Sequence, residues 1–396
     1  MDRLIYMDNA ATTSVKPEVV NVMLPYFTDN YANPSSIYNF AQKTKNAVED
    51  ARTIIAKMIG ADKPNEIYFT AGGSESDNWA LKAAAEHFKD KGNHIITTRI
   101  EHHAILHTCE WLEKHGYEVT YLDVDSNGLV NPKDFSAAIK DTTIIASVMF
   151  ANNEIGTIEP IKELGAIAHS RGVVFHTDAV QAFAHIPIDV KDMNIDMLSA
   201  SGHKFHGPKG VGFLYLSNKV KIGSFIHGGS QERSRRAGTL NVPGIIGMAE
   251  AARLSDMNME KDMKYVSDMR DYIINRIEDE IPYVILNGDR KNRLPGNMHF
   301  SFIGVPAEPL LIMLDQKGIC VSAGSACASG SIDPSHVLLA IGVGKDIARS
   351  SVRMTIGEDI TKEDADYVID ELKKVVERLR SMSPEYAEFI AGQMNN

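Results

Sequence analysis

A lysine stands where an apolar strand is expected to end, in a turn of small and hydroxyl residues. Lys204 follows Ser201, Gly202 and His203, after a short apolar run over residues 196–200. A primary amine in such a place can form a Schiff base with an aldehyde. A lysine beside a glycine is more often a solvated loop residue, so this turn indicates chemistry only in combination with other motifs.

A phosphate site is indicated by Gly72, Gly73 and Ser74, which lie between an expected strand and an expected helix. Glycines let the backbone approach a ligand closely, and the free N–H groups of a helix start suit a phosphate. The alternative is that Ser74 caps the helix, with Asp77 three residues on, and that nothing binds there.

A carboxylate, Asp178, follows another apolar strand, with Gln181 three residues on. A carboxylate at the carboxyl edge of a sheet can keep a ring nitrogen protonated, which makes a pyridine ring an electron sink. Gln181 would then be close enough to bond a ring hydroxyl. Read alone, Asp178 is more typical of an aspartate that caps the following helix.

Two adjacent histidines, His102 and His103, follow a third strand. An imidazole there can stack on a flat ring and move protons. The alternative is a solvated pair at a helix start. A metal pair is disfavoured, because adjacent residues on a helix do not face each other.

One of the three cysteines has only small neighbours. Cys327 lies in the run Ser322-Ala323-Gly324-Ser325-Ala326-Cys327-Ala328-Ser329-Gly330-Ser331. Such a segment cannot fill a core, so we expect an exposed, mobile loop whose thiol is a nucleophile that travels. Cys320, between Ile319 and Val321, is expected to be structural, and a Cys320–Cys327 redox pair is the alternative.

Two arginine-containing segments complete the set. Arg353, in a short alternating strand, could bind a carboxylate with both arms of its guanidinium, or form a surface ion pair. The stretch 227–244, which includes Arg236 and Thr239, could be a second anion-binding loop or a polar connection.

The whole chain excludes several classes of protein. Its 396 residues carry a net charge of −11, which repels nucleic acid and anionic membranes. No apolar run approaches the roughly 18 residues of a membrane span, and the first residues lack a signal core. Three sparse cysteines predict a reducing, cytoplasmic location, and no zinc-site spacing is present.

Short apolar runs alternate with helical patterns through the first 250 residues, which predicts an α/β fold with a mainly parallel sheet. Expected strands cover residues 66–70, 94–98, 143–150, 173–176, 196–200 and 211–216, and expected helices cover 74–89, 161–170 and a stretch from about 102. Ligands gather at the carboxyl ends of strands in such sheets.

The pattern changes after about residue 250, where a long polar helix is expected to begin near Met257. A second helix shows one apolar face, formed by Ala365, Val368, Ile369, Leu372, Val375, Val376 and Leu379. We expect a large domain over residues 15–256 and a small one from residues 1–14 and 257–396, which carries the cysteine loop at about 322–335.

Taken in order along almost the whole chain, these motifs resemble those of the cysteine desulfurases. The match adds residues 6–13, 32–36, 152–157, and 334–338 to the segments above. The Ser-x-Gly-Ser-Ala-Cys loop is similar to the subgroup that serves nitrogenase and housekeeping iron–sulfur assembly. Ser74 stands where many members carry threonine, and Ala237 where many carry serine.

The resemblance implies a pyridoxal-phosphate enzyme of the aspartate-aminotransferase fold type, with a seven-stranded sheet and a smaller α+β domain. For the cofactor ring it implies Lys204 as the Schiff-base lysine, His102 stacked over the ring, Asp178 on the ring nitrogen and Gln181 on the ring hydroxyl. For the phosphate it implies Gly73, Ser74, Ser201 and His203, with Thr239 reaching in from a second subunit. Asn153 and Arg353 would bind the substrate, and Cys327 would accept the sulfur.

The implied reaction takes sulfur from L-cysteine, leaves L-alanine, and forms a persulfide on Cys327. No intrinsic metal is implied, although the Cys327 persulfide could be a transient iron–sulfur ligand. The implied partners are a second copy of the chain and an acceptor such as an iron–sulfur scaffold, a tRNA-thiolation enzyme or a thiamine-pathway carrier. A selenocysteine lyase, an aminotransferase and a non-catalytic scaffold are the competing interpretations.

Overall fold

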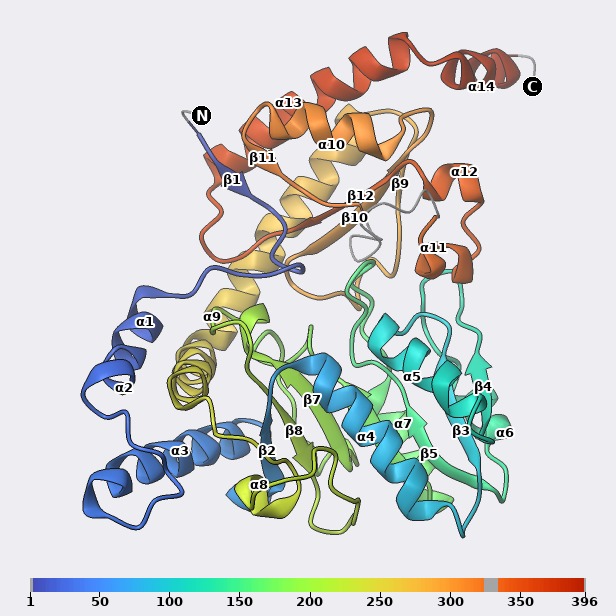
Figure 1. The fold of residues 1–396 in the computed structure, drawn as a ribbon. Coiled ribbons are helices and arrows are strands. Elements are labelled where there is room, and N and C mark those ends of the chain that lie inside the picture. Colours follow the sequence, from blue (N-terminus) through green and yellow to red (C-terminus); the bar gives the residue numbers. More distant parts are fainter. Residues whose placement is uncertain (1–2, 324–333, 395–396) are drawn as a thin grey trace.

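The computed structural model describes residues 3–323 and 334–394, and its main feature is a seven-stranded sheet (Figure 1). The strands, in spatial order, are β2 Ile67–Thr70, β8 Gly212–Leu216, β7 Met197–Ser201, β6 Val174–Asp178, β5 Thr143–Ser147, β3 His94–Thr98 and β4 Glu118–Leu122. Only β8 pairs antiparallel with its neighbours, and the pairs from β7 to β4 are parallel. The predicted α/β fold with a mainly parallel sheet is therefore confirmed.

Both faces of this sheet are packed against other elements. Successive side chains of a strand point to opposite faces, so neighbouring residues of one strand lie in different layers. Ile96 and Phe213 pack into a core with helix residues such as Val48 and Leu164. Their neighbours Ile95 and Leu214 pack into a second layer, with Trp79. A strand buried on both faces reads as a continuous apolar run, which is why the sequence revealed most of them.

The helices of the N-terminal 256 residues surround this sheet. They are α1 Pro17–Met23, α2 Pro25–Thr28, α3 Asn39–Met58, α4 Gly73–Phe88, α5 His103–Glu113, α6 Pro132–Ala138, α7 Ile161–Ser170, α8 Gln231–Ser234 and the start of α9 Val242–Glu280, with short 3₁₀ turns at Pro64–Glu66 and Gly202–Lys204. The predictions for residues 94–98 and 161–170 match β3 and α7. The helix predicted from Met257 begins earlier, at Val242, where Asn241 accepts a hydrogen bond from the N–H of Gly244.

A separate core lies at the top of Figure 1. It is built on the antiparallel strands β9 Val284–Leu286, β10 Asn297–Phe302 and β12 Ser351–Thr355, the parallel pair β1 Ile5–Tyr6 and β11 Ile319–Cys320, the C-terminal half of α9, and the helices α10 Ala307–Asp315 and α13 Lys362–Ser381. The helices α11 His336–Ala340 and α12 Lys345–Ala348 belong instead to a smaller cluster with Ile100 and Met149, and α14 Pro384–Met394 follows α13. Cys320 lies in a strand, as expected.

We propose that the two cores correspond to two domains, 15–256 and 1–14 with 257–396. In support, Ile5 and Met7 pack in the second core with residues from α9, α10 and α13. The proposed boundary at residue 257 falls inside α9, which runs without a break from the first core to the second (Figure 1). Among the described residues, none of the helices has the length and apolar character needed to cross a membrane.

The short segment α8, at one edge of the large sheet, is a left-handed turn and not a regular helix. Glu232, Arg233 and Ser234 have φ angles of 44°, 58° and 63°, a region that costs about 1–2 kcal/mol per residue for side chains other than glycine. The buried Glu232 carboxylate accepts hydrogen bonds from both arms of Arg52, at 2.9 and 2.8 Å, and from the N–H of Phe69 at 2.8 Å. These bonds hold the turn against helix α3 and strand β2.

The Arg52→Met variant should destabilise the fold strongly, because it leaves the Glu232 carboxylate buried without its counterion. Arg52 and Glu232 are 2% and 1% exposed, and removing one partner of a buried pair costs about 3–5 kcal/mol. Urea denaturation followed by circular dichroism measures the loss. The control Arg290→Met removes an exposed pair with Glu278 and should cost about 1 kcal/mol or less. Equal losses in the two variants would contradict this account of the turn.

Candidate active site

A cavity of about 360 Å³ lies where the carboxyl ends of β6 and β7 meet the N-termini of α4 and α5. The residues of the predicted site that line it are Gly73, Ser74, His102, Asn153, Asp178, Gln181, Ser201, His203, Lys204 and Arg353. Ten of the predicted positions, far apart in sequence, therefore surround one space. Its volume lies within the roughly 300–1,000 Å³ range of small-molecule sites.

Lys204 lies at the end of the 3₁₀ turn that follows β7. Its Nζ donates to the carbonyl oxygens of Ala10 and Ala11, at 2.6 and 2.9 Å. These carbonyls belong to the N-terminal segment, not to the sheet. The amine is thus bound at the cavity by backbone oxygens of a distant segment.

Asp178 is the last residue of β6, and its side chain accepts a hydrogen bond from the N–H of Val180 at 2.9 Å. Burial raises the pKa of Asp178 to about 6, against the opposing effects of that hydrogen bond and of the Lys204 charge. Asp77, on α4, lines the same cavity and is 1% exposed. Burial and the neighbouring Asp178 charge raise the pKa of Asp77 well above its usual value.

His102 caps helix α5, and its Nδ1 accepts a hydrogen bond from the N–H of Ala104 at 3.1 Å. Burial, and then the Lys204 charge, lower the pKa of His102 to about 4. The imidazole is therefore neutral at pH 7, with its proton on Nε2. His103 and His336 also line the cavity, with ring centroids 4.8 Å apart.

The N-terminus of α4 forms one end of the cavity. The alternative in which Ser74 caps the helix is wrong, because the helix begins at Gly73 and its N-cap residue is Gly72, which has no side chain to accept from the first N–H groups. A side chain at Gly73 would collide with Val180, whose Cγ2 would lie 2.5 Å from the added Cβ. Ser201, the last residue of β7, approaches this end, and His203 in the following turn lines the same cavity.

His203 is held by the N-terminal segment, since its Nδ1 lies 3.1 Å from Thr12 Oγ1. Burial, followed by the charges of Lys204 and Lys209, lowers the pKa of His203 to about 4. Gln181 donates from Nε2 to the Ala10 carbonyl at 3.0 Å. The side chains of His203 and Gln181 thus contact the same N-terminal segment that binds Lys204.

Arg353 enters the cavity from β12 and is buried, so the surface ion-pair alternative is wrong. Its guanidinium donates to Asp8 Oδ1 at 2.8 Å and to the carbonyl of Asn153 at 3.2 Å. Its Nε is buried with no hydrogen-bond partner among the described residues. A donor therefore remains for a ligand.

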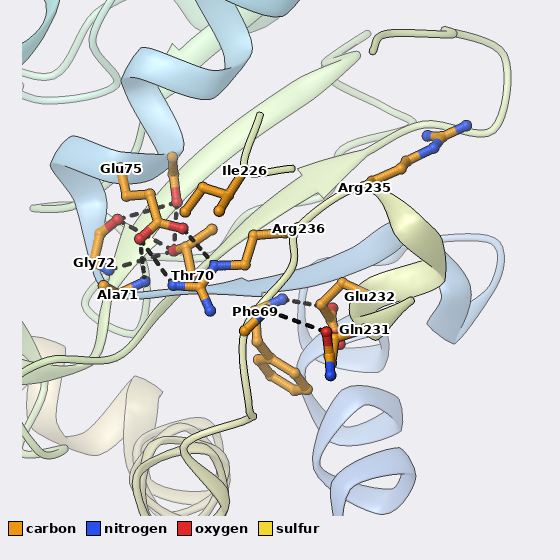
Figure 2. Close-up of polar contacts among 12 residues, drawn as sticks. Phe69, Thr70, Ala71, Gly72, Glu75, Ile226, Gln231, Glu232, Arg235 and Arg236 are labelled. Atoms are coloured by element: carbon orange, nitrogen blue, oxygen red, sulfur yellow. Dashed lines mark hydrogen bonds and ion pairs between the residues drawn. The ribbon is translucent and has the colours of Figure 1, made fainter. Parts of the chain in front are cut away.

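Of the predicted residues that the structure describes, Thr239 is not brought into this cavity within one chain. Thr239 is exposed and does not line it. Cys327 and most of the predicted cysteine loop lie outside the described residues. The segment before Thr239 is nevertheless tied to the site, because Arg236 binds both carboxylate oxygens of Glu75 on α4 (Figure 2).

Several residues with contacts at the cavity were not singled out from the sequence. The carbonyls of Ala10 and Ala11 hold Lys204, Asp8 holds Arg353, and Asp77 contributes a second carboxyl group. Residues 6–13 were recognised only as part of a family pattern. Backbone carbonyls carry no residue-type signal. Asp77, considered above only beside a Ser74 cap, could have been suspected as a site residue, because an acidic residue rarely stands on the buried face of a helix.

The donor set fits pyridoxal 5′-phosphate. Free N–H groups at a helix N-terminus, with a serine and a histidine beside them, suit a phosphate. The Asp178 carboxylate suits a protonated ring nitrogen, and Lys204 suits an aldehyde. Asp77 Oδ1 and Arg353 Nε are buried polar atoms of this cavity without a hydrogen-bond partner in the described chain, which is typical of a site built for a polar ligand.

Comparisons with known proteins agree with this geometry. The aminotransferase class-V family model matches residues 5–368. Cysteine desulfurase IscS of Clostridium botulinum strain Hall is 55% identical over 98% of both chains, and that of Methanosarcina thermophila is 52% identical over 97% of this chain and 94% of its own.

Two solved structures are also similar. A NifS-like protein superposes with a TM-score of 0.89 at 34% identity, over 95% of this chain and 100% of its own. A structure of SspA in complex with cysteine gives a TM-score of 0.80 at 37% identity, over 89% and 99%. The chain therefore belongs to the class-V aminotransferase family, whose cofactor is pyridoxal 5′-phosphate, and within that family to the cysteine desulfurases.

Proposed function

We propose that this chain removes sulfur from L-cysteine, releasing L-alanine and leaving a persulfide on Cys327. The observation that carries the proposal is that a lysine amine, a buried carboxylate and a buried arginine with an unpartnered N–H surround one cavity. These groups suit an aldehyde, a cationic ring and a substrate carboxylate, respectively. The name of the SspA relative, solved with cysteine, is consistent with this substrate.

The amino-acid end of the substrate would be bound by Arg353 and Asn153. The guanidinium is buried, so its hydrogen bonds to a carboxylate are weakly screened. Asp8 and the Asn153 carbonyl fix its orientation before substrate arrives. This preorganisation reduces the entropy lost on binding.

Pyridoxal phosphate, when bound, supplies an electron sink that weakens the bonds at the α- and β-carbons of an attached amino acid. Lys204 would remove the Cα proton through its Nζ. Asp178 would keep a proton on the ring nitrogen, and Gln181 would bond the ring hydroxyl. His102 would stack over the ring, with its proton on Nε2, because Nδ1 accepts the Ala104 N–H.

Sulfur transfer would be a displacement at the substrate sulfur. The Cys327 thiolate forms the new S–S bond, the Cβ–S bond breaks, and the electron pair and a proton pass to the carbon that becomes the alanine methyl group. L-Cysteine and a cysteine thiol thus give L-alanine and a persulfide without an external reductant. The persulfide could also bind iron–sulfur iron transiently. An acceptor such as an iron–sulfur scaffold or a tRNA-thiolation enzyme would collect the sulfur in the cytoplasm.

A homodimer would complete the site, with Thr239 of one subunit on the phosphate of the other. Thr239 is exposed within one chain, as this role requires. In addition, residues 27–38 expose several large apolar side chains, namely Phe27, Tyr31, Ile37 and Tyr38, of which Ile37 is 95% exposed. Contiguous exposed apolar side chains are typical of protein interfaces.

Replacing the proposed nucleophile should stop sulfur transfer without stopping cofactor chemistry. We expect Cys327→Ala to retain the visible absorbance of bound cofactor, and its change on addition of L-cysteine, but to form no sulfide with a reductant. Cys320→Ala, in strand β11, is the matched control and should retain activity. Sulfide and alanine assays measure both, and normal turnover by Cys327→Ala would refute the assignment.

Mixed dimers test whether Thr239 acts across subunits. Lys204→Ala removes the amine of its own site, and Thr239→Ala removes the hydroxyl given to the other site. A heterodimer of the two variants should contain one intact site, so activity at limiting cofactor should appear when the subunits are exchanged. Differently tagged subunits verify the exchange. Verified heterodimers without a gain in activity would exclude the shared site.

The cofactor-free protein should lose stability as pH rises through the pKa of Asp178. That pKa is about 6 when folded and about 3.9 when unfolded, so the folded state binds the extra proton between these values. Asp178→Asn removes the penalty of a buried charge and should raise the unfolding free energy by about 1–3 kcal/mol at pH 8, and by less at pH 4.

Urea denaturation at the two pH values measures this difference. Asp123→Asn, whose side chain is 83% exposed, is the control and should change stability by less than about 0.5 kcal/mol at either pH. An equal increase in the unfolding free energy of Asp178→Asn at pH 4 and pH 8 would rule out the buried charge as the cause of that increase.

A further inference from the structure

The first turn of α4 carries a carboxylate next to the proposed phosphate site. Glu75 follows Gly73 and Ser74, and its Oε2 accepts a hydrogen bond from the N–H of Ala71 at 3.1 Å. A carboxylate there interacts favourably with the helix N-terminus. A phosphate bound to the same N-terminus, however, brings a charge of about −1.5 to −2, and the two negative groups would repel each other.

Arg236 supplies the missing positive charge. Its Nε donates to Glu75 Oε1 at 2.8 Å, and its Nη2 donates to Oε2 at 3.1 Å (Figure 2). The two side chains are only 17% and 15% exposed, so solvent screens this pair less than a surface pair. The bidentate geometry also fixes the carboxylate in one orientation.

The neighbouring arginines do not share this task. The Arg233 guanidinium lies 3.9 Å from the centre of the Tyr68 ring and donates to the carbonyl of Ile67. Arg235 extends away from Glu75 in Figure 2 and lies 5.5 Å from the same ring. The main chain of Arg236 is held as well, since Ala237 donates to the Ile226 carbonyl at 3.0 Å.

We propose that Arg236 is a positioning residue for the cofactor phosphate, acting by neutralising Glu75 at the N-terminus of α4. The inference rests on the proposed function, because it takes Gly73 and Ser74 as the phosphate site. The proposal also gives the polar stretch 227–244 a role at the phosphate site. Thr239 lies three residues beyond Arg236, so the same ion pair anchors the segment that would reach the second subunit.

The test compares two ligands that differ only in the phosphate. Full-length chain freed of cofactor is titrated with pyridoxal 5′-phosphate and with pyridoxal, and binding is followed by absorbance. Arg236→Gln should weaken binding of pyridoxal phosphate about tenfold, and leave pyridoxal within about twofold of the unaltered chain. Inorganic phosphate should accordingly raise the melting temperature of this variant less than that of the unaltered chain.

A double variant distinguishes the loss of charge balance at Glu75 from a displacement of the segment that carries Arg236. Glu75→Gln with Arg236→Gln removes both charges and should restore most of the affinity for pyridoxal phosphate, and Arg236→Lys should retain most of it. Arg290→Gln, which opens an exposed pair with Glu278, is the control and should bind both ligands normally.

The inference is overturned if Arg236→Gln weakens both ligands equally, or if the double variant binds pyridoxal phosphate as poorly as Arg236→Gln alone. Loss of affinity in Arg236→Lys equal to that in Arg236→Gln would also overturn it. A chain with native residues that binds neither ligand would instead refute the proposed function itself.

Discussion

A short N-terminal segment, residues 8–13, is the constraint on which the candidate site depends. The Ala10 carbonyl accepts hydrogen bonds from both Lys204 and Gln181, and Thr12 contacts His203. On its other side, Asp8 holds Arg353, and the Ala10 N–H donates to Thr355 Oγ1 at 2.9 Å. Side chains from the large sheet and from the second core are thus set relative to each other by one short stretch of backbone.

The electrostatics of the site follow from burial more than from any single ion pair. Desolvation raises the pKa values of Asp77 and Asp178 and lowers those of His102 and His203. A cationic ring between such groups would relieve the cost of the buried carboxylate, because opposite charges interact strongly where water is excluded. The energy stored in an unpaired Asp178 is therefore available for binding the proposed cofactor.

Two arginine–glutamate pairs hold the edge of the large sheet in place. Arg52 anchors the left-handed turn through Glu232, and Arg236 anchors the segment that follows through Glu75. The first pair is buried and the second is largely buried, so removing the arginine from either pair leaves a poorly solvated carboxylate without that counterion. The first pair determines whether this edge folds. The second lies beside the proposed phosphate site, where its charge balance matters for ligand binding.

The sequence by itself determined the mainly parallel sheet, because strands buried on both faces appear as apolar runs, and it identified ten residues that line one cavity. It placed the start of α9 too late, since the apolar face of that helix is interrupted by polar residues after Leu254. It also left open a capping role for Ser74 that the helix does not use. Only the tertiary structure decided that Arg353 is buried against Asp8 and that Lys204 is held by two backbone carbonyls. The physical reason is that these contacts join residues about 190–345 positions apart, and neither carbonyl oxygens nor long-range partners leave a pattern in local sequence.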